Sequence, residues 1–149
     1  MEKITTFKDG HRFLSNFWPV KVEYEGITYP STEHAYQAAK TLDFVTREEI
    51  RNLSTPAETK KFVRKKSFPK RPDWEEWEKI GKINVMYELL WKKFQHPELR
   101  QMLLLTGDKV LEEGNTWGDT FWGICKGEGK NMLGILLMNV RDKIRKGVK

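Results

Sequence analysis

The sequence of 149 residues contains very little cysteine or histidine. Its single cysteine, Cys125, excludes an internal disulfide and is typical of a protein from a reducing compartment. With only three histidines beside that cysteine, a four-ligand zinc site would need carboxylates at unusual spacings. We therefore expect a protein that holds no metal and no other cofactor.

Long apolar runs are also missing. The longest, residues 103–105 and 135–138, are far shorter than the roughly 20 residues that cross a bilayer. The first ten residues, MEKITTFKDG, contain no apolar signal segment. We expect a cytoplasmic protein with no membrane association.

Repeats, low-complexity tracts and Gly/Ser-rich linkers are absent as well, so we expect a single domain over residues 1–149. Hydrophobic residues make up 38% and charged residues 32% of the chain, which is the balance of a compact globular protein. A chain of this size buries roughly 70% of the surface that its unfolded form exposes. It can therefore build a core without cross-links.

The positive charge of the chain is concentrated. The net charge is +6, yet residues 60–71 hold seven basic side chains and no acidic one. These seven are Lys60, Lys61, Arg64, Lys65, Lys66, Lys70 and Arg71. The last nine residues add +4, and subtracting both segments from the total leaves −5 on the remainder. A localised positive field suits a phosphate-bearing substrate or a nucleic acid, and a solvated helix face is the alternative.

The N-terminal part of the chain shows the patterns of short strands. Strands are expected over residues 4–7, 20–24 and 27–29. Glu25 and Gly26 are a suitable two-residue hairpin turn between the last two. Ser31 then supplies a helix cap. These features predict a small N-terminal β-sheet.

The rest of the chain is mainly helical by periodicity. Helices are expected over residues 32–42, 46–53, 73–95 and 97–105. Thr55, followed by Pro56 and by Glu58, forms a capping box with proline at the first helical position, which predicts a further helix start. A last helix has an apolar face of Leu133, Leu137, Val140 and Ile144. The sequence therefore predicts an α+β fold, a single mainly helical domain with a small N-terminal β-sheet.

Two stretches do not fit a core-building role. Residues 12–19 (RFLSNFWP) crowd aromatic and amide side chains into a segment too proline-bounded for a helix. Residues 115–123 (NTWGDTFWG) alternate two tryptophans with glycines and one carboxylate. Glycine lets the backbone approach a ligand, and tryptophan offers a flat face to a nucleobase. Each stretch alone is equally an aromatic-packed loop, whereas their joint occurrence favours a site.

Five blocks that span nearly the whole chain form a specific pattern. They are LSNF with Pro19 at residues 14–19, YPSTEHAYQAAK at 29–40, KRPDW at 70–74, residues 115–123, and GEGKNMLG at 127–134 followed by LLM at 136–138. In these blocks and their order the sequence resembles the YbiA-like, or NADAR, N-glycosidases. One departure is Val63, where many relatives have a glycine before the arginine.

The resemblance implies a small α+β fold and hydrolysis of an N-glycosidic bond to ribose. Its substrates would be ribosylamino-pyrimidine phosphates of riboflavin biosynthesis, or bases from which ADP-ribose is released. The resemblance also assigns the catalytic glutamate to Glu33 and a functional tryptophan and aspartate to Trp117 and Asp119.

The chemistry of these residues agrees with that assignment. Breaking a bond between ribose C1′ and nitrogen develops positive charge on the sugar, so a nearby carboxylate can stabilise the transition state and activate water. Glu33 is otherwise a glutamate that compensates the helix dipole, and Asp119 is otherwise a turn aspartate.

Further candidate substrate-binding residues are Asn16, Phe17, His34, Gln37, Lys40, Arg64, Trp122 and Asn131. The aromatic residues would face the loop tryptophan across the base, although at least one of these rings is expected in the core. Asn16 either binds a ribose hydroxyl or closes its own turn, and His34 is more often structural. Gln37 shares a helical face with the glutamate, and Lys40 and Arg64 suit a phosphate.

We therefore expect a metal-independent N-glycosidase, a hydrolase of N-glycosyl bonds that binds a small phosphorylated ribosyl substrate and has no obligate protein partner. Two alternatives stay open. One is an ADP-ribosyl glycosidase acting on modified bases of nucleic acid. The other is a non-catalytic nucleotide or nucleic-acid binding module that uses the basic segment and the loop aromatics.

Overall fold

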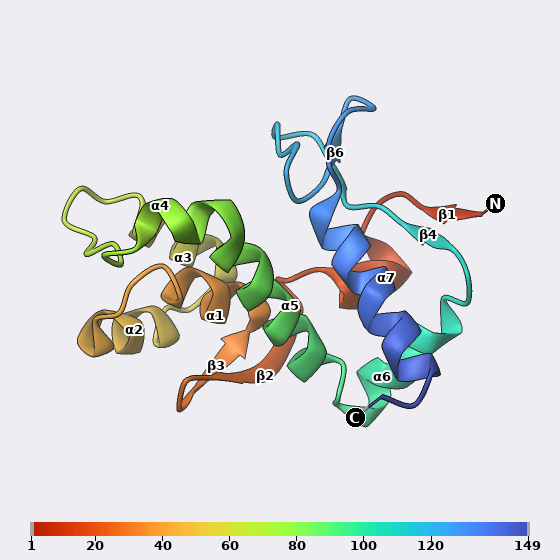
Figure 1. Ribbon diagram of the computed structural model, residues 1–149, viewed down its shortest axis with the longest axis horizontal. Coiled ribbons are helices and arrows are strands. Elements are labelled where there is room, and N and C mark those ends of the chain that lie inside the picture. The colour runs from red at the N-terminus through yellow and green to blue at the C-terminus, as the bar shows by residue number, and fades with distance from the viewer. Residues whose placement is uncertain (1, 149) are drawn as a thin grey trace. The chain divides into compact units, whose positions relative to one another are not determined.

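The computed structural model describes residues 2–148 of the chain (Figure 1). The chain forms two compact units, one of the residues up to Ser15 together with those from Phe94 onward, and the other of residues Asn16–Lys93. Each unit contains helices and at least one two-stranded sheet, so the fold is α+β and mainly helical, as predicted. The single domain expected over residues 1–149 stays a prediction.

The second unit opens with the predicted hairpin. β2 (Pro19–Tyr24) pairs antiparallel with β3 (Ile27–Ser31), and the turn between them places Glu25 at φ 47° and Gly26 at φ 88°. Two successive positive φ values are typical of a type I′ turn, whose twist matches that of the strands. Side chains alternate between buried and exposed along β3, so one face of the hairpin belongs to the core of this unit.

The helices of this unit are α1 (Thr32–Ala38), α2 (Phe44–Arg51), α3 (Pro56–Val63), α4 (Trp74–Glu76) and α5 (Lys82–Lys93). Every residue of α1 is buried, and this helix packs against α2, α3, α5 and the hairpin (Figure 1). Ser31, Asp43 and Thr55 cap the first three helices, each accepting a hydrogen bond from the amide three residues further on. The helix starts predicted at Ser31 and Thr55 are therefore confirmed.

The helix predicted over residues 32–42 ends earlier, at Ala38. Arg71 accounts for this end. Its guanidinium Nη1 donates to the carbonyl of Ala39 over 2.9 Å, and its backbone amide donates to the carbonyl of Lys40 over 3.0 Å. Because a residue distant in sequence donates hydrogen bonds to these carbonyls, the helix can end here without leaving them unpaired.

The helix predicted over residues 73–95 is interrupted. A π-helical turn, η2 (Trp77–Gly81), separates α4 from α5. The indole of Trp77 lies over Gly81, where an added Cβ would sit 2.7 Å from the ring atom Cδ1. The turn holds Trp77, which is only 2% exposed, against Tyr36, with their ring centroids 5.7 Å apart. A π turn here thus reflects tertiary packing of one large ring.

The first unit has short strands and long helices. β1 (Lys3–Ile4) pairs in parallel with β4 (Val110–Leu111), and β5 (Gly114–Asn115) pairs in parallel with β6 (Ile124–Cys125). Its helices are η1 (Asp9–Leu14), α6 (Pro97–Leu105) and α7 (Met132–Arg145). The apolar face predicted for the last helix is confirmed, because Leu133, Leu137, Val140 and Ile144 are all buried.

Three predictions for the first unit were wrong in detail. β1 covers residues 3–4 instead of 4–7. Residues 12–14, expected to be non-helical, belong to the 3₁₀ helix η1, whose short i→i+3 bonds need only a few residues. The sheet structure also extends beyond the N-terminal hairpin, since β1 pairs with β4 far along the chain and β5 pairs with the nearby β6. Between residues 2 and 148, no helix is long and apolar enough to cross a membrane.

Candidate functional site

Glu33, the second residue of α1, carries a buried carboxylate that is only 5% exposed. Its backbone amide donates to the carbonyl of Asn16 over 3.0 Å, which ties the segment before β2 to the start of the helix. The Nε2 group of Gln37, one turn later, donates to Glu33 Oε2 over 2.7 Å. The structure thus brings three of the predicted site residues together.

Several oxygen atoms around Glu33 are buried without a partner. Asn16 Oδ1, Gln37 Oε1 and the Oγ1 hydroxyl of Thr32 have no hydrogen-bond partner among residues 2–148. An unsatisfied buried polar group costs about 1–3 kcal/mol, and folded proteins retain few of them. Carboxamide oxygens accept hydrogen bonds, so hydroxyl groups of a ligand would satisfy them.

Lys40 is the last predicted site residue of the segment that starts with α1. It is half-buried, and its Nζ lies 5.4 Å from the centroid of the Tyr36 ring. Burial lowers the pKa of Lys40, while the negative charge of Glu33 acts in the opposite direction. Tyr36 packs in turn on Trp77, so an aromatic stack supports this lysine.

Phe17 is 40% exposed and carries a cation over its ring. The Nζ of Lys60, from α3, lies 5.3 Å from the ring centroid. Arg64, the predicted phosphate ligand, is the exposed C-cap residue of α3, one helical turn beyond Lys60. Sequence reasoning missed Lys60 as a site residue because all seven basic side chains of residues 60–71 look alike in the sequence.

His34 has a structural environment. Its Nδ1 lies 2.7 Å from Ser31 Oγ, and its Nε2 lies 3.0 Å from the carbonyl oxygen of Leu53. Since a carbonyl only accepts, Nε2 donates to Leu53 and Nδ1 accepts from the serine hydroxyl. Nε2 thus holds α1 to the segment after α2, Nδ1 bonds the serine that caps α1, and the predicted contact of His34 with substrate stays a prediction.

The loop of residues 115–123 belongs to the first unit and is braced by two polar side chains. Asn115 Oδ1 accepts from the amide of Asp119 over 3.0 Å, and its Nδ2 donates to the Asp119 carbonyl over 2.9 Å. Asp119 Oδ1 accepts from the amides of Phe121 and Trp122 at 3.1 and 2.9 Å. One carboxylate oxygen of Asp119 therefore closes a turn, as expected of a turn aspartate. The other oxygen, Oδ2, is left for other contacts.

The two tryptophans of this loop differ in exposure. Trp117 is 62% exposed and precedes Gly118, which has φ +85°. Trp122 is half-buried and meets the ring of Phe121 edge-on, with centroids 4.8 Å apart. Trp117 thus presents an open aromatic face on a turn that glycine permits.

Asn131, at the start of α7, is buried and fully used by its own unit. Its Oδ1 accepts from the amide of Glu113 over 3.0 Å, and its Nδ2 donates to the carbonyl of Leu111 over 2.9 Å. These bonds fasten β4 and the segment after it to α7. The contact of Asn131 with substrate that the sequence suggested stays a prediction.

The predicted residues thus form two groups, one in each unit. Around α1 lie Asn16, Phe17, Glu33, Gln37 and Lys40, and the loop of the first unit holds Trp117, Asp119 and Trp122. The acidic pair of Glu33 with Asp119 stays a prediction. Sequence reasoning also missed Asn115, although an asparagine four residues before the loop aspartate is a suitable brace.

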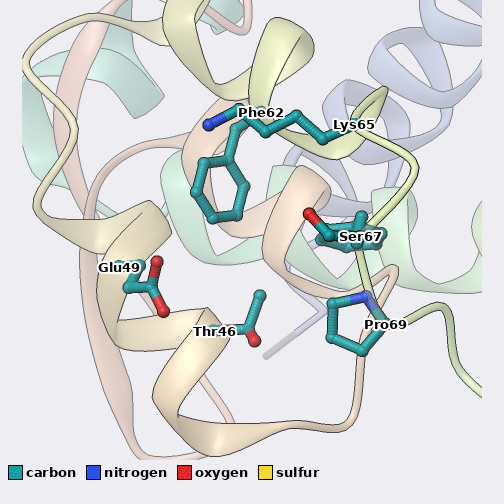
Figure 2. A pocket seen from close by; sticks show the side chains of 7 residues that line it. Thr46, Glu49, Phe62, Lys65, Ser67 and Pro69 are labelled. Carbon is teal, nitrogen blue, oxygen red and sulfur yellow. The ribbon is translucent and has the colours of Figure 1, made fainter.

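A separate hollow of about 200 Å³ lies in the second unit. Figure 2 shows Thr46 and Glu49 of α2 facing Phe62 of α3 and Lys65, which follows that helix, with Ser67 and Pro69 on the far side. None of the predicted site residues lines it. The basic segment therefore contributes to more than one surface of this unit.

Comparison with known proteins supports the resemblance. Residues 5–145 match the model of the NADAR domain. The chain is 44% identical over 140 residues to the N-glycosidase YbiA of Escherichia coli K12, covering 91% of this chain and 83% of that protein. It is 36% identical over 137 residues to an N-glycosidase of Nostoc punctiforme, covering 89% of this chain and 85% of that protein.

Two further relatives extend this picture. A riboflavin biosynthesis protein of Vibrio vulnificus is 34% identical over 139 residues, covering 92% of this chain and 36% of that protein. The NMR structure of the E. coli protein YbiA superimposes with a TM-score of 0.80 at 38% identity, covering 99% of this chain and 88% of that one. The α+β fold therefore agrees with a solved structure.

Proposed function

We propose that this chain, which belongs to the NADAR family and is a hydrolase of N-glycosyl bonds, acts on a ribosylamino-pyrimidine phosphate with Glu33 as its catalytic carboxylate. The names of relatives from Vibrio vulnificus and Zea mays, both riboflavin biosynthesis proteins, support this substrate class. We place the reaction in the cytoplasm, in one domain formed by residues 1–149.

One observation carries the proposal. The buried Glu33 carboxylate accepts from Gln37, its amide donates to the Asn16 carbonyl, and the carboxamide oxygens of Asn16 and Gln37 have no partner in the described part of the chain. A ribosyl group brings hydroxyl donors for such acceptors and, at C1′, the carbon on which positive charge develops. A pocket built for an apolar ligand would not retain these oxygens.

The reaction follows from this arrangement. As the bond between C1′ and the amine nitrogen lengthens, its electron pair leaves with the amine and the sugar becomes oxocarbenium-like. Glu33 stabilises that charge and accepts a proton from the water that attacks C1′, and this proton then passes to the departing nitrogen, so that the sugar gains a hydroxyl and the amine leaves neutral. Gln37 holds the carboxylate in position through its 2.7 Å hydrogen bond. Trp117 as the platform for the base and Asp119 as the second carboxylate of the acidic pair stay predictions from the sequence.

The test is direct. Purified protein is incubated in parallel with ribosylamino-pyrimidine phosphate and with ADP-ribosylated DNA, and release of ribose phosphate or ADP-ribose is followed. We expect ribose phosphate to appear with the first substrate. Release of ADP-ribose alone would replace the proposed substrate by the nucleic-acid one, and binding of either without release would contradict hydrolysis by this chain.

A further inference from the structure

Two lysines from different elements of the second unit lie over aromatic rings close to the Glu33 segment. Lys40 follows α1 and lies over Tyr36, whereas Lys60 belongs to α3 and lies over Phe17. Phe17 is the neighbour of Asn16, whose carbonyl accepts the Glu33 amide. α1 packs against α3, and Lys40 is near enough to both Glu33 and Lys60 for their charges to act on it.

The charges of these groups act on one another. Burial is the main cause that lowers the pKa of Lys40, the negative charges of Glu33 and Glu78 oppose this shift, and the positive charges of Lys82 and Lys60 add to it. Neither lysine has a carboxylate within 4.0 Å in the part of the chain that the structure describes. The two half-buried cations repel each other, and an anion bound between them would be attracted by both.

The other basic side chains of this segment have different neighbours. Arg71 is bound to Asp73 and to backbone carbonyls after α1. Lys65 lies over Phe62, and Lys70 lies over Trp74. Lys61, the neighbour of Lys60 in the sequence, is exposed.

We propose that Lys60 and Lys40 together form the subsite for the phosphate of the ribosyl substrate. Lys60 then has the role of phosphate ligand that the sequence analysis gave to Arg64. This inference rests on the proposed function for the identity of the ligand. Two ammonium donors match a phosphate dianion in charge, and aromatic rings beneath them hold both in place without neutralising them. The Glu33 carboxylate repels the phosphate, so the phosphate lies toward the lysines and C1′ toward the carboxylate.

The test measures binding of ribose 5-phosphate and of ribose by titration calorimetry, without turnover. For Lys60→Gln we expect affinity for ribose 5-phosphate to fall about ten- to a hundredfold, with ribose binding unchanged. Lys60→Arg keeps the charge and should retain most of the affinity. Lys61→Gln and Arg64→Gln are matched controls that remove one positive charge each from the same helix end, and both should bind like the wild type.

Three results would overturn the inference. They are wild-type affinity in Lys60→Gln, an equal loss in Lys61→Gln or Arg64→Gln, or no binding of ribose 5-phosphate to the wild type. The proposed function fails separately. A wild type that binds ribose 5-phosphate through Lys60 and cleaves no ribosylamino-pyrimidine phosphate contradicts the function alone, whereas a Lys60→Gln variant that cleaves it with unchanged kcat/KM contradicts the inference alone.

Discussion

Gln37 donates a hydrogen bond from Nε2 to Glu33 Oε2 over 2.7 Å, one helical turn apart on α1. The bond fixes the direction of a buried carboxylate, while the carboxamide oxygen of the same glutamine faces the interior without a partner among residues 2–148. A side chain that satisfies the carboxylate and leaves its own acceptor open is suited to a ligand with hydroxyl groups.

Replacing Glu33 by Gln should lower turnover by a factor on the order of 10² to 10⁴, because the variant keeps the shape of the side chain and loses its charge. Gln37 can still donate to the new carboxamide oxygen, so the fold and substrate binding should persist. The measurement is kcat on the wild type and variant, with Glu49→Gln, at an exposed glutamate of α2, as the control. Near-normal turnover in Glu33→Gln would move the catalytic role elsewhere, first of all to Asp119.

Replacing Trp117 by Ala should weaken substrate binding by about five- to 150-fold, since stacking of a base on an aromatic ring is worth roughly 1–3 kcal/mol. With the side chain 62% exposed, the melting temperature should change little. Trp77→Ala is the contrasting control, because truncating that buried indole should cost roughly 3–5 kcal/mol of stability. Unchanged affinity in Trp117→Ala would exclude it as the base platform.

Asp119→Asn and Asp119→Ala separate a structural role from a chemical one. Asparagine can keep the acceptor for the amides of Phe121 and Trp122, whereas alanine removes it and should destabilise the loop. If Asp119 contacts substrate through its charge, both variants should lose activity at least tenfold. If the turn is its whole function, Asp119→Asn will keep wild-type kcat/KM and only Asp119→Ala will lose it.

Chelators should leave the rate unchanged, because carboxylate-assisted loss of an amine from C1′ needs no metal ion. The assay is initial rate before and after extended treatment with EDTA, followed by addition of Mg²⁺, Mn²⁺ or Zn²⁺. Loss of activity that one of these ions restores would require the acidic residues to be reinterpreted as metal ligands.

The local features of the fold could be predicted from the sequence. The turn at Glu25 and Gly26, the caps Ser31 and Thr55, and the apolar face of α7 depend on residues close together in the chain. Short-range sterics and hydrogen bonds decide such features, so the residue types are enough to recognise them.

Other features depend on residues far apart in the sequence. The end of α1 depends on Arg71, which meets it across more than thirty positions, and the π turn at Trp77 depends on packing against Tyr36. The parallel partner of β1, the strand β4, likewise comes from a distant part of the chain. Periodicity reports on one helix at a time, so it cannot show where a distant side chain ends or widens that helix.

For the candidate site, sequence motifs singled out Glu33, Gln37 and the loop of residues 115–123 because their residue types match a known chemistry. Whether such a side chain is buried and what it contacts was decided by tertiary packing alone. Only the fold makes Glu33 5% exposed and places Lys60, of seven similar basic residues, over Phe17. The physical reason is that burial and charge proximity depend on which elements pack together, and α1 meets α3 through contacts that neither segment encodes by itself.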